Sequence, residues 1–331
     1  MRKYDIAIVG ATGLVGRTFQ KVLTERNFPI DNITFYASER SAGTTLNFLG
    51  KDYTVVELKE ENIHKFDFAL FSAGGTISKE FAPIFAANGT IVIDNSSAWR
   101  MNEECPLVVP EVNPEDLEWH RGIIANPNCS TIQLLLPLKA IMRDFGLKKV
   151  VVSTYQSISG AGQKGLDQLY AEMSGDFSKT SKHQIYSNTM FHAVDENEQD
   201  WTNEEIKMIK ESRKMLHDPD LDITVTCVRL PLQIGHAETV YIETNKELQR
   251  NQILESLLSM ENLIVQDELN TETYPTPMQT AHLDEVFVGR IRKDLNNPHA
   301  FWMWVVANNI RKGAATNAVQ IAEKMIEMKL L

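Results

Sequence analysis

A single cysteine lies where the local sequence could activate it as a nucleophile. Cys129 falls within 126-NPNCSTIQ-133, and the helical periodicity of apolar residues begins at Ile132. The cysteine should therefore lie in the first turn, or at the cap, of a helix over roughly 130–145. Free backbone amides and the helix dipole at such an end stabilise a thiolate. The same amides could hold an oxyanion after the thiolate attacks a carbonyl.

A histidine and an arginine occur close together farther along the chain. His236 lies in a Gly-containing turn between two predicted strands, and Arg229 lies seven residues earlier in the first of them. If the turn folds back, both side chains can line one pocket. Histidine is the side chain best suited to move protons near neutral pH. For each residue alone, a polar turn residue or a surface strand charge is an equally good interpretation.

A glycine-rich turn suggests a nucleotide site at the other end of the chain. The turn 10-GATGLVG-16 follows a buried strand over 4–10 and precedes an amphipathic helix over 17–26. Glycine lets the backbone approach a pyrophosphate, and the helix N-terminus supplies amide donors. The small residues of 72-SAGGTIS-78 are of the kind expected beside a dinucleotide. A tight turn without a ligand is the alternative for the glycine-rich segment.

The end of the second strand indicates which dinucleotide is bound. The segment 36-YASERSAG-43 contains Glu39, which could bond a ribose hydroxyl as in NAD sites. Arg40 is better suited to a 2′-phosphate, because guanidinium pairs with phosphate in a forked geometry. The sequence therefore favours NADP. Cofactor contacts are predicted from these segments at Gly10, Ser38, Ser41, Ser72 and Gly74.

A thiolate beside a nicotinamide indicates one kind of chemistry. A thiol adds to an aldehyde, hydride transfer to the nicotinamide leaves a thioester, and an acceptor then cleaves that thioester. Water as the acceptor gives an acid, and phosphate gives an acyl phosphate. The other two cysteines, Cys105 and Cys227, lie before a proline and inside an apolar strand, and we expect them to be inert.

The elements that must position these residues divide into two patterns. The first 130 residues alternate between apolar strands and helical segments, which predicts a doubly wound, Rossmann-type parallel sheet. After Cys129, one long helix is followed by strands with few crossover helices, which predicts an α+β domain with a mixed or antiparallel sheet. The polar segment 165–217 is expected to be largely helical. The apolar stripe of a last helix over 314–329 fits packing back on the first domain.

We therefore expect an NADP-binding domain over 1–128, completed by 313–331, and a catalytic and dimerisation domain over 129–312. The composition, with 43% hydrophobic and 23% charged residues, is that of a soluble globular protein. The net charge of −11 argues against nucleic acid as the main ligand. There is no signal-peptide pattern and no apolar run long enough to span a membrane, so a cytoplasmic location is expected. No metal-ligand pattern stands out.

Several segments together form a highly specific set of motifs. They are 10-GATGLVG-16, 38-SERSAG-43, 108-VVPEVN-113, 126-NPNCSTIQ-133, 153-STYQSISGAG-162, 225-VTCVRLPLQIGHAE-238 and 312-KGAATNAVQIAE-323. With this set, the chain resembles the bacterial aspartate-semialdehyde dehydrogenases over essentially its full length; only the segment 163–195 matches loosely. The resemblance implies that NADPH reduces L-4-aspartyl phosphate, reversibly, to L-aspartate 4-semialdehyde and inorganic phosphate. It also implies a place in lysine, threonine, methionine and diaminopimelate biosynthesis, and a homodimer or, in some members, a tetramer.

The resemblance also implies roles for single residues. It makes Cys129 the nucleophile, His236 the acid/base residue and Gln156 a residue that orients the substrate near the thiol. Arg229 would clamp the α-carboxylate of the substrate. The other substrate and phosphate contacts would be Arg100, Asn128, Glu204 and Lys207, with Glu204 meeting the amino group. The other cofactor contacts would be Thr12, Gly13, Leu14, Val15, Arg40, Ser41, Ser159, Gly160 and Asn309.

Two other functions remain as alternatives. An N-acetyl-gamma-glutamyl-phosphate reductase would share the chemistry and the architecture, but its cysteine context is expected to be closer to NPGCYPT. A non-catalytic NADP-binding regulator would be expected to lack Cys129, Gln156, Arg229 or His236, and all four are present.

Overall fold

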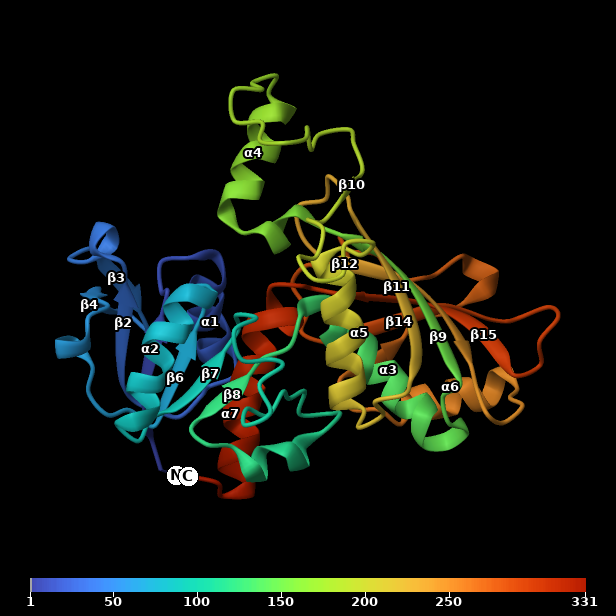
Figure 1. Cartoon of the computed structure of the whole chain (residues 1–331), viewed down its shortest axis with the longest axis horizontal. Coiled ribbons are helices and arrows are strands. Elements are labelled where there is room, and N and C mark those ends of the chain that lie inside the picture. The colour runs from blue at the N-terminus through green and yellow to red at the C-terminus, as the bar shows by residue number, and fades with distance from the viewer. Residues whose placement is uncertain (1) are drawn as a thin grey trace. The chain divides into compact units, whose positions relative to one another are not determined.

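The computed structural model describes residues 2–331, which fold as two compact units (Figure 1). The first unit runs as far as Pro127 and also includes the C-terminal segment Ala314–Leu331. The second unit is Asn128–Gly313. Each unit has its own β-sheet.

The sheet of the first unit has six strands in the order β5-β2-β1-β6-β7-β8. Every pair of neighbouring strands is parallel, so the prediction of a parallel, doubly wound sheet is confirmed. In parallel sheets of this kind, ligands bind at the carboxyl ends of the strands. The strands are β1 (Tyr4–Val9), β2 (Ile30–Ala37), β5 (Val56–Glu57), β6 (Phe68–Phe71), β7 (Ile91–Asp94) and β8 (Ile123–Ala125).

Helices cover both faces of this sheet because the residues of β1 are apolar on both sides. Ile6 and Ile8 pack in one core with α1 (Leu14–Glu25) and α7 (Thr316–Met328). The alternate residues Ala7 and Val9 pack in a second core with α2 (Gly75–Ala87). The prediction that the last helix packs on the first domain is therefore confirmed. The hairpin of β3 (Thr45–Phe48) and β4 (Lys51–Thr54) was not predicted.

The second unit contains a seven-stranded sheet in the order β10-β11-β9-β12-β15-β14-β13. Strand β11 runs parallel to β9, and β13 runs parallel to β14, while the other neighbours are antiparallel. The predicted mixed sheet is thus confirmed. The strands are β9 (Lys149–Gln156), β10 (Met190–Phe191), β11 (Asp222–Arg229), β12 (His236–Glu243), β13 (Leu263–Val265), β14 (Val286–Lys293) and β15 (Ala300–Ala307).

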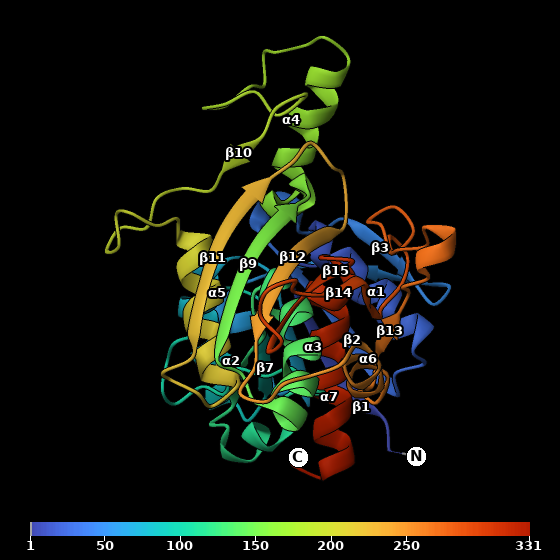
Figure 2. The same ribbon diagram turned by 90° about the vertical axis from the view of Figure 1, so that its right-hand side faces the viewer.

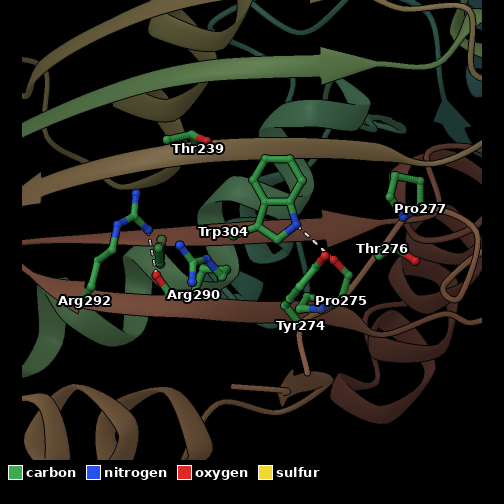
Figure 3. A pocket seen from close by; sticks show the side chains of 9 residues that line it. Thr239, Tyr274, Pro275, Thr276, Pro277, Arg290, Arg292 and Trp304 are labelled. Carbon is green, nitrogen blue, oxygen red and sulfur yellow. Dashed lines mark hydrogen bonds between the residues drawn. The ribbon is translucent and has the colours of Figure 1, made fainter. Parts of the chain in front are cut away.

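One face of the mixed sheet is covered by helices and the other carries aromatic side chains. Helices α3 (Cys129–Phe145), α5 (Asn203–Met215) and α6 (Arg250–Leu258) pack on the covered face. On the opposite face the rings of Tyr155 and Trp304 lie 5.5 Å apart. A cavity of about 420 Å³ lies there, beside Trp304 and between Thr239, Tyr274 and the arginines of β14 (Figure 3).

The segment 165–217 is less helical than the sequence predicted. It contains the end of α4 (Gln163–Met173) and then α5, but the residues between them form only turns and the short strand β10. The buried Glu172 explains part of this difference, because its carboxylate accepts hydrogen bonds from the backbone amides of Ile185 (2.7 Å) and Tyr186 (2.8 Å). Both ribbon views show α4 and the loop after it projecting from one end of β9 and β11 (Figures 1 and 2). We call residues 163–195 the arm.

Candidate active site

Cys129 is the first residue of helix α3, and Asn128 is its N-cap. The Oδ1 atom of Asn128 accepts hydrogen bonds from the backbone amides of Ser130 (2.9 Å) and Thr131 (3.2 Å). The predicted place of the cysteine in the first turn is therefore confirmed. The sequence also suggested that first-turn amides could hold an oxyanion. Those of Ser130 and Thr131 already donate to the cap, so these two amides are not available to an oxyanion.

The backbone of Gly313 packs directly against Cys129. A Cβ atom at position 313 would lie only 2.8 Å from the Cβ of Cys129, which is too close for any side chain. Gly313 belongs to a π-helical turn, Arg311–Ala315, before α7. Turns of this type are frequent at functional sites. The thiol is thus confined on this side by backbone.

A buried polar network fixes the residues around the cysteine. Gln156 donates through Nε2 to Oγ of Ser130 at 2.7 Å. The Nδ2 atom of Asn128 donates to Oε1 of Glu204 at 2.7 Å, and the backbone N–H of Asn128 donates to Oε2 of Glu211 at 2.7 Å. Because these groups lie on α3, α5 and β9, the network joins the N-terminus of α3 to two other elements.

Glu204 carries a negative charge within this network. Burial alone would raise the pKa of its carboxyl, but His192, Lys207 and Arg229, together with the hydrogen bond from Asn128, lower the pKa to about 2. Lys207 lies one turn farther along α5, with its Nζ 3.5 Å from Oε2 of Glu204. The side chain of Lys207 is about one-third exposed, so its ammonium group can also reach a ligand.

His236 is fully buried and held by the backbone. The N–H of Ser157 donates to Nδ1 of His236 at 2.9 Å. A backbone N–H can only donate, so Nδ1 accepts and the neutral ring carries its proton on Nε2. Burial, followed by the charge of Arg229, lowers the pKa of His236 to about 3. Within the described residues Nε2 has no hydrogen-bond partner, so its N–H is available to a ligand.

Arg229 and His236 border the same small space. A Cβ atom at Gly160 would lie 3.2 Å from Nη1 of Arg229 and 3.3 Å from Nε2 of His236. Arg229 donates through Nη1 to the carbonyl oxygen of Ser157 at 2.9 Å and through Nη2 to Nε2 of His192 at 2.7 Å. Glycine at position 160 therefore leaves room for a ligand beside both groups.

Ser159 and Asn309 support the loop that carries Gly160. The Nδ2 atom of Asn309 donates to Oγ of Ser159 at 3.0 Å, and its Oδ1 accepts from the backbone N–H of Gly235 at 2.9 Å. Oδ1 also accepts from Oγ of Ser157 at 3.1 Å. These bonds connect the segment after β15 with two others: the loop of Ser157 and Ser159, and Gly235 directly before His236.

The glycine-rich turn of the first unit has the close packing that a nucleotide site requires. Gly10 has a φ of +84°, and a Cβ there would lie 2.9 Å from the backbone of Ser72. A Cβ at Gly16 would lie 2.2 Å from the carbonyl oxygen of Gly10, so only glycine fits at either position. Between them, the residues at the start of α1 are partly exposed: Thr12, Gly13, Leu14 and Val15.

The other predicted cofactor contacts also follow strands of the parallel sheet. Ser38 and Arg40 are exposed directly after β2, and Ser41 ends a short 3₁₀ turn. Ser72 follows β6, and Gly74, with a φ of +86°, is the N-cap of α2. These residues lie at the carboxyl edge of the parallel sheet, where a dinucleotide would bind.

Arg100 lies in the first unit and is held by backbone carbonyls. It donates through Nε to the oxygen of Asn126 at 3.0 Å and through Nη2 to that of Asn95 at 2.8 Å. The structure thus brings together Asn128, Cys129, Gln156, Ser159, Gly160, Glu204, Lys207, Arg229, His236 and Asn309 within the second unit. Arg100 and the residues of the glycine-rich side belong to the first unit.

Sequence reasoning missed several residues that hold this site. Ser130 and Ser157 lie inside recognised motifs, and their positions next to Cys129 and Gln156 were a usable signal. Glu211 lies on the same face of a predicted helix as Glu204 and Lys207, and this spacing could have indicated it. His192 lies in the arm, where the sequence matched the family only loosely, and no histidine other than His236 was assigned a role. Its contact with Arg229 has no local sequence signal.

In the part of the chain made up of residues 2–331, no group of three or more His, Cys, Asp or Glu side chains is arranged to hold a metal ion. Nor is any helix in it both long and apolar enough to cross a membrane.

Comparison with known proteins defines the class of this chain. A family model described as "Semialdehyde dehydrogenase, NAD binding domain" matches residues 5–120, and one described as "Semialdehyde dehydrogenase, dimerisation domain" matches residues 138–312. The fold and these matches define an oxidoreductase with a nicotinamide dinucleotide-binding unit. An aspartate-semialdehyde dehydrogenase of Aquifex aeolicus is 52% identical over 338 residues, which cover 99% of each protein.

Other relatives agree. An aspartate-semialdehyde dehydrogenase of Bacillus subtilis is 45% identical and covers 100% of this chain and 99% of its own length. The crystal structure of aspartate semialdehyde dehydrogenase II from Vibrio cholerae, complexed with ASA, superposes with a TM-score of 0.92 at 42% identity, covering 99% of both chains. The chain belongs to the aspartate-semialdehyde dehydrogenase family, so the resemblance inferred from the motifs is confirmed.

Proposed function

We propose that the chain reduces L-4-aspartyl phosphate to L-aspartate 4-semialdehyde, with NADPH as the reductant and release of inorganic phosphate. The reaction is reversible and belongs to lysine, threonine, methionine and diaminopimelate biosynthesis. The observation that carries the proposal is the site of the second unit, where Cys129 begins α3 and both His236 and Arg229 border the space at Gly160. The similar proteins support the proposal, because they are named as dehydrogenases of aspartate semialdehyde.

Cys129 provides the nucleophile in this proposal. Its thiolate attacks the acyl carbon of the acyl phosphate, a C–S bond forms, and the bond from carbon to the phosphate oxygen breaks. The product is a thioester on Cys129, and the phosphate takes up the one proton that the overall reduction consumes. When bound, NADPH supplies the hydride that reduces the thioester, after which the C–S bond breaks and the aldehyde leaves.

His236 acts on the oxygen of the reacting carbonyl. The tautomer fixed by Ser157 presents Nε2–H to the space at Gly160. A donor there stabilises the oxyanion that develops when the thiolate or the hydride attacks. The position of Nε2–H supports His236 as the acid, or hydrogen-bond donor, of the proposed acid/base role. In this proposal His236 holds the oxyanion in place of the amides of Ser130 and Thr131, which donate to Asn128.

Charged residues select the substrate. Arg229 binds the α-carboxylate in a fork, and Glu204, ionised because of its lowered pKa, meets the α-ammonium group. Arg100 and Lys207 hold the phosphate group, and Gln156 and Asn128 orient the acyl group near the thiol. For the residues of the second unit, these roles are supported by the hydrogen bonds that hold Asn128, Gln156 and Arg229 in place around the site.

The residues of the first unit fit NADP. Only glycine fits at Gly10 and Gly16, which is the close packing expected of a turn before a pyrophosphate-binding helix. Thr12, Gly13, Leu14 and Val15 would hold the pyrophosphate at the start of α1. Arg40, with Ser38 and Ser41, would bind the 2′-phosphate. Three residues of the second unit are proposed as contacts of the nicotinamide end: Ser159, Gly160 and Asn309.

The second unit forms a homodimer in this proposal. Its matched family model is described as a dimerisation domain, and the uncovered face of its sheet carries paired aromatic rings, among them Tyr241 and Trp302, 5.0 Å apart. Apolar surface of this type is common in stable homodimer interfaces. Trp304 lies at the centre of the view of this face (Figure 3).

The proposed activity is tested by following NADPH formation from L-aspartate 4-semialdehyde with and without inorganic phosphate. We expect phosphate-dependent formation in multiple turnovers. A folded protein that forms no NADPH from this aldehyde, but does so from N-acetylglutamate semialdehyde, would replace the proposed substrate. Inactivity with both would indicate the non-catalytic regulator instead.

A further inference from the structure

Arg229 is held from two sides, and the second contact comes from the arm. Its Nη1 donates to the carbonyl oxygen of Ser157 at 2.9 Å, and its Nη2 lies 2.7 Å from Nε2 of His192. A guanidinium group has five N–H donors and no acceptor. Nε2 of His192 must therefore accept, which means that this ring is neutral and carries its proton on Nδ1.

The short strand β10 delivers His192 to this position. Met190 pairs with Arg229 and Phe191 pairs with Val228 in antiparallel register, and His192 follows directly. Strand β10 is one of the two edge strands of the mixed sheet. Its backbone pairing therefore places an arm residue beside the guanidinium group at the end of β11. Figure 2 shows β10 near that end of β11.

A cavity beside Arg229 could accept its side chain in a second position. A cavity of about 300 Å³ lies between Arg229 and the arm, lined also by Ile158, Lys164, Gln168 and Phe191. Within the described residues, the two bonds to Ser157 and His192 are the hydrogen bonds that Arg229 makes. Without the acceptor on His192, the guanidinium group would be held by one bond and could turn into this cavity.

We propose that His192 is a positioning residue for substrate recognition, which holds the guanidinium group of Arg229 in place for the substrate carboxylate and releases it on protonation. The inference rests on the proposed role of Arg229 as the carboxylate clamp. His192 does not touch the substrate in this account. It acts through Arg229, and it makes the arm part of the binding site.

Charged groups from three elements face His192 and decide its protonation. Burial of the ring lowers its pKa, and the positive charges of Arg229 on β11 and Lys207 on α5 act in the same direction. Glu204 on α5 and the backbone at Cys227 oppose them, and His236 on β12 is the other titratable ring nearby. Since the net shift is downward, His192 is neutral at neutral pH and its acceptor is lost only in acid.

The experiment compares steady-state kinetics of the full-length protein and its variants with L-aspartate 4-semialdehyde. His192→Leu removes the acceptor, and we expect KM to rise by roughly tenfold or more, the loss typical of a hydrogen bond to a charged group, while kcat changes much less. In His192→Gln, Oε1 can accept in place of Nε2, and we expect KM to return to within about threefold of the original. His64→Leu, at an exposed position before β6 in the first unit, is the matched control and should leave KM unchanged.

The pH dependence separates positioning from a merely structural role. KM of the unmodified protein should rise as the pH falls below the usual range of histidine, whereas KM of His192→Gln should lose this rise because glutamine does not titrate there. An unchanged KM in His192→Leu would overturn the inference, as would an identical acid rise in His192→Gln. If the leucine variant does not fold, the pH profile of the glutamine variant decides alone.

Arg229→Lys distinguishes this inference from the proposed function. If that variant raises KM and His192→Leu does not, only the positioning role of His192 is wrong. If Arg229→Lys leaves KM unchanged, the clamp itself is wrong, and the inference fails with it.

Discussion

The backbone N–H of Ser157 donates a 2.9 Å hydrogen bond to Nδ1 of His236. Because a backbone amide cannot accept, this bond determines the tautomer of the ring and directs Nε2–H toward Gly160. It also opposes protonation of Nδ1, in agreement with a pKa of about 3 that burial and Arg229 produce. His236 is thus a neutral hydrogen-bond donor over the whole range in which the protein would work.

Gly160→Ala should interfere with both groups at once. The added methyl group would lie 3.2 Å from Nη1 of Arg229 and 3.3 Å from Nε2 of His236, closer than ordinary van der Waals contact. Small displacements of reacting groups are costly, so we expect kcat/KM to fall roughly tenfold or more. The melting temperature should stay nearly constant, since the methyl group enters the ligand space and not the core. A full loss of folding, or an unchanged kcat/KM, would contradict the proposed location of this space.

Arg229→Lys should lower kcat/KM by on the order of 100-fold and raise KM, because lysine cannot form the forked pair with a carboxylate. Steady-state kinetics at saturating NADP and phosphate measure this. Arg143→Lys is the control, since that arginine lies at the exposed end of α3 and pairs with Asp144. An effect no larger than that of the control would remove the clamp from the account.

Arg40→Ala should weaken NADP binding by roughly 10- to 100-fold, as expected for the loss of a hydrogen bond between charged groups. NAD binding should be unchanged, because NAD has no 2′-phosphate. Both affinities can be measured by the quenching of protein fluorescence or by calorimetry. Lys51→Ala, an exposed charge on β4, controls for the overall charge. An equal loss of both affinities would place Arg40 away from the 2′-phosphate.

Glu238→Gln should change how stability depends on pH. Glu238 is fully buried on β12, and its carboxylate oxygens, like the side-chain atoms of Gln133 and Thr154, have no hydrogen-bond partner in the described part of the chain. Burial raises the pKa of this carboxyl well above its usual range. The folded state therefore binds more protons than the unfolded state above the unfolded pKa, and stability declines as the pH rises from there through the folded pKa.

In the Glu238→Gln variant no carboxyl titrates at this position, so this cause of the decline in stability with rising pH is absent. The variant's free energy of unfolding, relative to that of the unmodified protein, should increase as the pH rises above about 5, with a limiting slope of about 1.4 kcal/mol per pH unit. Thermal unfolding in a series of buffers measures the difference. A difference that stays constant with pH would show that Glu238 is ionised in the folded protein.

Local chemistry explains what could be predicted from the sequence. The start of α3 at Cys129 follows from the polar cap before an apolar helical run, and the glycine-rich turn follows from the strand and helix around it. Both depend on neighbours within a few residues. The parallel first sheet and the mixed second sheet follow from the order of apolar strands and helices in the same way.

Other parts of the site depend on contacts between distant segments. The bond from Asn128 to Glu211 joins residues 83 positions apart, and the bond from Ser157 to His236 joins residues 79 apart. His192 lies in a polar arm without helical or alternating periodicity, so nothing nearby in the sequence places it against Arg229. The extent of helix in that arm was overestimated for the same reason, since Glu172 captures backbone amides that a helix would have used.

The most direct test concerns the acyl group on Cys129. The protein is mixed with L-aspartate 4-semialdehyde and NADP without phosphate, quenched in acid, and digested for mass spectrometry, while NADPH is followed by absorbance. The account predicts a burst of about one NADPH per site, an aspartyl adduct on the peptide that contains Cys129, and loss of this adduct when phosphate is added. Cys129→Ala should show neither burst nor adduct but still bind NADP. Turnover by the alanine variant, or an adduct on another residue, would contradict the account.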